Sequence, residues 1–81
     1  MNNDFESKEY LEEKLKWVRY RLKMLNEIEN KLKEMRNLAE TAKINTLSPI
    51  EIEEINIKIE QLRNEVIELD KNSRALLSEW L

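Results

Sequence analysis

The 81-residue chain contains no glycine, no cysteine, no histidine and only one proline. Without cysteine or histidine it lacks disulfides, thiolate nucleophiles, the commonest general base and the usual ligands of transition metals. The scarcity of glycine and proline also removes the residues that most often build tight turns. These absences favour long, uninterrupted helices and exclude most classes of enzyme and metalloprotein.

The residues that are present have the composition of a coiled coil. Charged residues make up 38% of the chain and hydrophobic residues 41%, and most of the charged ones are long-chain helix formers. The alternative, a disordered chain, is disfavoured because the apolar residues recur at helical spacing. We therefore predict an all-α fold, a two-helix antiparallel coiled-coil hairpin that assembles into a dimeric four-helix bundle.

The strongest local signal lies where the chain is expected to reverse. Ser48 is a good N-cap, Pro49 suits the first helical position, and Glu51 completes a capping box with Ser48. Leu47 and Ile52 are spaced as a hydrophobic staple. A new helix is therefore expected to begin at residue 49.

These signals predict one domain over residues 1–81. The first helix is expected over about 4–43, the turn over about 44–48 and the second helix over about 49–80. Asn3 and Glu6 form a second candidate capping box, at the start of the first helix.

Each predicted helix carries an apolar stripe, and the two stripes are expected to pack together. The first is Leu11, Leu15, Val18, Leu22, Leu25, Ile28, Leu32, Met35, Ala39 and Ala42. Its heptad phase slips once, between Leu25 and Ile28. The second has an unbroken heptad spacing and is Ile52, Ile55, Ile59, Leu62, Val66, Leu69, Ser73, Leu76 and Trp80.

A second stripe on the first helix is the candidate protein interface, formed by Tyr10, Trp17 and Met24 with Tyr20 beside them. Two helices bury little apolar surface, so a second copy or another protein is expected to cover this stripe. The alternative is that these side chains cover the hairpin's own end, at Leu76, Leu77 and Trp80.

A basic and aromatic segment suggests a different function. Its candidate basic patch is Lys14, Lys16, Arg19, Arg21 and Lys23, interleaved with Trp17 and Tyr20. Such a segment can bind nucleic acid. This reading is the weaker one, because the basic residues point around the helix, Glu12, Glu13 and Glu27 flank them, and the chain carries a net charge of −3.

No catalytic residues, metal site or cofactor are predicted. The pairs Glu12-Glu13 and Glu53-Glu54 are adjacent on their helices and so do not face each other. No apolar run approaches the ~20 residues that cross a bilayer, and the N-terminus lacks a signal-peptide pattern. A cytoplasmic, non-enzymatic protein is the expectation.

Four stretches of the two predicted helices form a pattern of their own. They are Leu25-Asn26-Glu27-Ile28, Met35-Arg36-Asn37-Leu38-Ala39-Glu40-Thr41-Ala42, Ile59-Glu60-Gln61-Leu62-Arg63-Asn64-Glu65-Val66 and Leu69-Asp70. Together they resemble the helical hairpin of the bacterial flagellin core domain. The resemblance spans residues 25–74, with Asn45 to Pro49 in place of the family's glycine-containing loop. It implies a rod-like hairpin that packs against neighbouring subunits, in a structural or export-related role.

Overall fold

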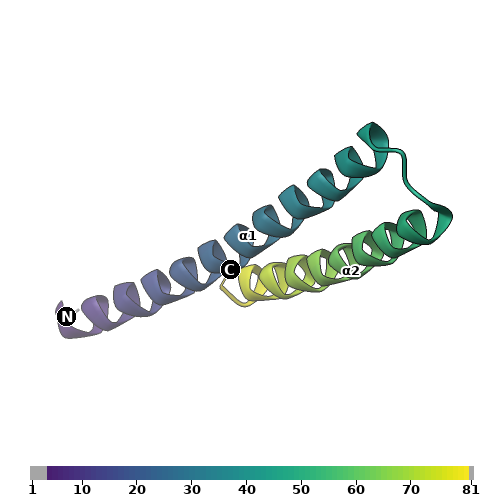
Figure 1. The fold of residues 1–81 in the computed structure, drawn as a ribbon. Helices are drawn as coiled ribbons and strands as arrows, with labels where there is room; N and C mark the ends of the chain where they lie inside the picture. The colour runs from purple at the N-terminus through teal and green to yellow at the C-terminus, as the bar shows by residue number, and fades with distance from the viewer. Residues whose placement is uncertain (1–3, 81) are drawn as a thin grey trace.

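A computed structural model describes residues 4–80, and it shows an antiparallel hairpin of two helices (Figure 1). Helix α1 spans Asp4–Ile44 and helix α2 spans Pro49–Trp80. The molecule is a rod of 71 × 17 × 12 Å with a radius of gyration of 19.6 Å, where a compact chain of this length would have about 12 Å. The predicted all-α helical hairpin is confirmed.

The reversal of the chain uses the predicted capping box. The backbone N–H of Glu51 donates to the Ser48 hydroxyl at 3.2 Å, and the backbone N–H of Ser48 donates to the Glu51 carboxylate at 3.2 Å. This reciprocal pair satisfies two backbone donors at the start of α2. The hydrogen bond from the Ser48 backbone also lowers the pKa of Glu51. The other predicted box includes Asn3, which lies outside the described residues.

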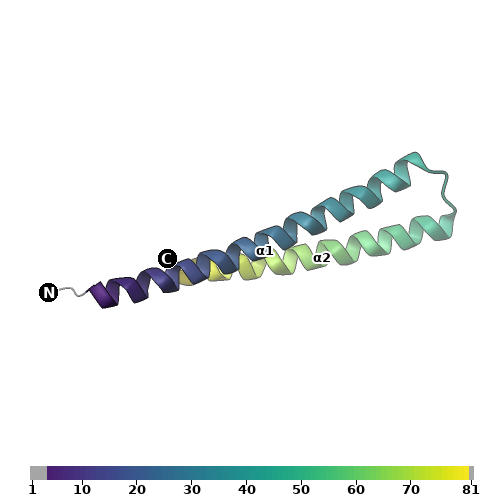
Figure 2. The same ribbon diagram turned by 60° about the vertical axis from the view of Figure 1, so that its left-hand side comes forward.

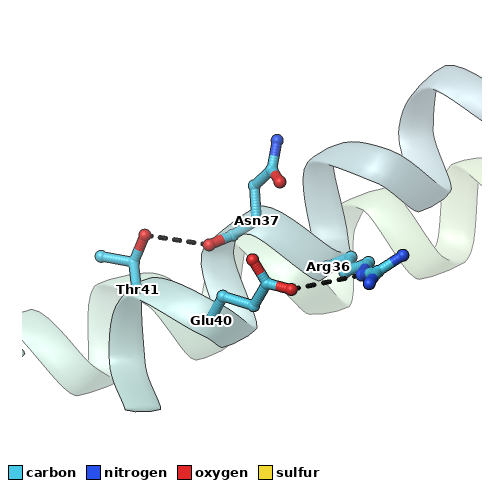
Figure 3. Close-up of polar contacts among 4 residues, drawn as sticks. All are labelled: Arg36, Asn37, Glu40 and Thr41. Atoms are coloured by element: carbon cyan, nitrogen blue, oxygen red, sulfur yellow. Dashed lines mark hydrogen bonds and ion pairs between the residues drawn. The ribbon is translucent and has the colours of Figure 1, made fainter. Parts of the chain in front are cut away.

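Local side-chain hydrogen bonds also tie down the end of α1 (Figure 3). The Thr41 hydroxyl donates to the Asn37 carbonyl at 2.9 Å, and Arg36 pairs with Glu40 one turn later at 3.2 Å. Beyond the last turn, both the backbone N–H and the side-chain amide of Asn45 donate to the Thr41 carbonyl. Asn45 therefore donates two hydrogen bonds to a carbonyl in the last turn of α1, a helix that has no glycine at its end.

The two helices differ in length, so one end of α1 has no partner. Helix α1 has 41 residues and α2 has 32, a difference of about 14 Å at the usual helical rise. The first turns of α1 project past the end of α2 in both views (Figures 1 and 2). Tyr10 and Leu11, in this projecting segment, are exposed.

The side chains of α1 that pack against α2, along the seam between the helices, are not the predicted ones. From residue 14 onward, the half-buried side chains of α1 are Lys14, Trp17, Val18, Arg21, Met24, Ile28, Lys31, Met35, Leu38 and Ala42. Apart from Val18 they step alternately by three and four residues, which is an unbroken heptad. Lys31 lies on this line and bonds Glu65 of α2 at 2.7 Å, so the line faces α2. The predicted slip near Leu25 is therefore absent from the seam.

The leucines expected in the seam lie on one flank of it. Leu11, Leu15, Leu22, Leu25 and Leu32 are between 42% and 64% exposed. The prediction was wrong for them because two apolar stripes run side by side on α1 and periodicity alone does not say which one meets α2. Ile28, Met35 and Ala42 were placed correctly.

The stripe predicted for α2 is confirmed over most of its length. Ile55, Ile59, Val66, Leu69 and Leu76 are half-buried, while Leu62 is 3% exposed and Ser73 is 2% exposed. Leu62 is the one buried apolar side chain among those that the structure describes. The Trp80 side chain lies outside the described part. A hairpin with so small a core is short of hydrophobic stabilisation.

The helices diverge toward the connection in both views (Figures 1 and 2). Near this end Ile44, Ile50 and Ile52 are exposed. The best-packed part of the seam therefore lies away from the turn, around Leu62 and Ser73.

Candidate interaction surfaces

Helix α1 carries an exposed row of apolar side chains, the leucine face, which we define as Leu11, Leu15, Val18, Leu22, Leu25 and Leu32. Successive members are three, four or seven residues apart, so they line one side of the helix. Val18 is half-buried and the five leucines are exposed. A row of leucines at coiled-coil spacing is a surface suited to another helix.

The predicted aromatic interface is divided between two environments. Trp17 and Met24 are half-buried and lie on the seam line, whereas Tyr10 and Tyr20 are exposed. Trp17 and Leu76 of α2 line the same surface depression, as expected of side chains that cover the hairpin's own end. The side chains of Leu77 and Trp80, which belonged to that alternative, are outside the described part.

The residues of the predicted basic patch also lie in two different environments. Lys14 and Arg21 lie on the seam line, where Lys14 stands over the Tyr10 ring at 5.4 Å and the Arg21 Nε is buried. Lys16, Arg19 and Lys23 are exposed. They line the shallow depression beside Trp17 and Tyr20, together with Glu9, Glu12, Glu13 and Leu76. The three carboxylates thus balance the charge of the three basic side chains there. A surface that binds nucleic acid carries a net positive charge instead.

One ion pair joins the two helices. The Lys31 ammonium donates to the Glu65 carboxylate at 2.7 Å, and the Lys31 side chain is 29% exposed. This hydrogen bond raises the pKa of Lys31 and lowers the pKa of Glu65. The other ion pairs found in the described residues join neighbours within one helix, so Lys31–Glu65 is the one that couples α1 to α2.

Glu65→Gln is expected to make the hairpin less stable at neutral pH but not at acid pH. Because the pKa of Glu65 is lower in the folded state, its contribution is present above the ordinary value of 4.5 and is lost as pH falls through the folded value. Urea midpoints measured by circular dichroism from pH 3 to 8 would test this, with Glu68→Gln, an exposed glutamate on the same helix, as control. A difference that persists undiminished at pH 3 would contradict the pairing.

The described residues contain no group of three or more acidic side chains placed to hold a metal ion. Neither described helix combines the length and the apolar character needed to cross a membrane.

Neither a known family nor a solved structure identifies this chain. No family model matches it, and neither a curated protein nor a solved structure is significantly similar to it.

Proposed function

We propose that this protein is a non-catalytic association module, a helical hairpin that binds a second copy of itself and so forms a dimer of four helices. The observation that carries the proposal is the exposed leucine face of α1. Five leucines at coiled-coil spacing are left in water while the seam of the same helix contains Arg21 and Lys31. Covering the leucine face would supply the apolar burial that the hairpin lacks.

The exposed area of the chain supports this proposal. The hairpin exposes 6930 Å² for a mass of 9.8 kDa, whereas a compact monomer of that mass would expose about 5,200 Å². The excess, roughly 1,700 Å² per chain, is comparable with the total area of about 1,600 Å² that a standard interface buries from both partners. A dimer thus has enough surplus surface to form a stable interface.

The association is tested by light scattering across a dilution series at neutral pH. We expect a mass of about 20 kDa, twice the mass of the chain, at micromolar concentration and a fall toward the monomer on dilution. Helical content measured on the same samples should fall with the mass, because the separated hairpin retains a small core. A folded monomer at every concentration would rule out self-association.

A further inference from the structure

We infer that the second copy packs on the leucine face in the opposite direction, so that α1 lies antiparallel to α1 of the partner around a two-fold axis between residues 23 and 24. This inference rests on the proposed function, since it assumes that the hairpin binds itself. It adds the orientation, the alignment of the two faces and the residues that would specify them.

The spacing of the leucines is the first argument. Antiparallel coiled coils pair the two alternating heptad positions of one helix with the opposite positions of the other. With the axis between residues 23 and 24, Leu22 of each copy lies level with Leu25 of the other, and Leu15 lies level with Leu32. Four leucine layers then form symmetrically about the axis, as an isologous interface requires.

The charge along α1 is the second argument. Residues 4–16 hold five acidic and three basic side chains, and residues 31–43 hold four basic and two acidic ones. The proposed alignment places these two segments side by side. Residues 31–43 still hold more basic than acidic side chains when Lys31, which pairs with Glu65, is left out of the count. A parallel alignment would oppose the acidic segment to itself, which is unfavourable.

The same counts distinguish between antiparallel alignments. A shift by one heptad would oppose residues 4–16 to residues 24–36, which hold three acidic and three basic side chains, and the attraction would be lost. That shift would also bring Glu29 level with Leu11 and next to Glu12 of the other copy. Charge therefore favours the alignment in which Leu22 meets Leu25.

Glu29 and Arg36 are polar residues that fall at the same heptad spacing as the leucines, and both fit this alignment. Glu29 lies level with Val18 and beside Arg19 of the other copy, which offers its carboxylate a cation. Arg36, exposed and paired with Glu40, lies level with Leu11, where its methylene groups can cover the leucine while the guanidinium stays in water. A polar residue at such a position commonly specifies register.

The shape of the hairpin is consistent with the same arrangement. The unpartnered first turns of α1 would run beside residues 31–43 of the other copy, near the end where the helices diverge (Figure 2). Leu11, exposed on the projecting segment, would then be covered. The antiparallel dimer thus supplies each projecting segment with a neighbouring helix that its own α2 is too short to provide.

Spin-label distances test the orientation, and the absence of native cysteine allows single-site labelling. Glu12→Cys and Lys23→Cys are the two sites, both exposed and outside the six residues of the leucine face. In the antiparallel dimer the two labels at position 12 are offset along the axis by about 35 Å, and those at position 23 by about 2 Å. Both variants are checked for unchanged mass and helical content before labelling.

The outcomes separate the two proposals. A long distance at position 12 together with a short one at position 23 supports the antiparallel dimer. Short distances at both positions indicate parallel packing and overturn this inference while leaving self-association intact. An offset of about 24 Å at position 12 would indicate the alignment shifted by one heptad and overturn the proposed register. No coupling between labels at either position, with a monomeric mass, would overturn both proposals.

Discussion

The double substitution Leu22→Glu and Leu25→Glu is expected to convert the dimer into a monomer of low helical content. Each substitution removes a leucine from the centre of the proposed interface, and the two-fold axis makes every change count twice. Loss of a buried leucine costs about 2–5 kcal/mol, and facing carboxylates add repulsion. The dissociation constant should therefore rise by at least about a hundred-fold, measured by light scattering.

The matched control for this experiment is Ile57→Glu on α2. Leu22 and Ile57 are each 54% exposed in the hairpin, so the exposure of the replaced side chain is the same. Ile57 lies outside the leucine face, and we expect its replacement to change the stability by no more than about 0.5 kcal/mol. If both variants dissociate equally, the effect belongs to added negative charge and not to the leucine face.

Leu62→Ala is expected to lower the free energy of unfolding by about 2–5 kcal/mol, the range for a leucine removed from a packed core. Leu62 is 3% exposed and is the one buried apolar side chain among those described, so no second core can compensate. A small domain has little stability to lose. Urea denaturation at a fixed protein concentration would measure the loss.

Ile67→Ala is the control for Leu62→Ala, because Ile67 is an exposed side chain on the same helix. It should change the urea midpoint little. Because Leu62 packs within one hairpin, Leu62→Ala should lower the stability at any concentration at which the hairpin is folded, whereas the effect of the leucine-face substitutions should depend on concentration. Equal losses for Leu62→Ala and Ile67→Ala would show that Leu62 is not the centre of the core.

Local features were predictable because nearby residues create them. Ser48, Pro49 and Glu51 specify a helix start by hydrogen bonds that span three residues. The absence of glycine leaves few other places where the chain could turn. The α2 stripe was also readable, since α2 carries a single heptad line that runs through Ile55, Leu62 and Leu69.

The side chains of α1 that meet α2 could not be read from periodicity. Leu22 and Leu25 outrank Arg21 and Lys31 in hydrophobicity, and sequence reasoning therefore placed the leucines inside. The long stems of Arg21 and Lys31 can nevertheless cover apolar surface at a seam while their charged ends reach water or a partner, as Lys31 does with Glu65.

The helical fold, the place where the chain reverses and the buried side of α2 all follow from the order of the residues. Each of these depends on hydrogen bonds or spacing within one helix or one turn. Three other features appear only when the two helices are packed together: which apolar stripe of α1 meets α2, how far α1 projects beyond α2, and hence which leucines are left exposed. Those features depend on how two rods align, and that alignment is set by contacts between residues far apart in the chain, such as Lys31 with Glu65.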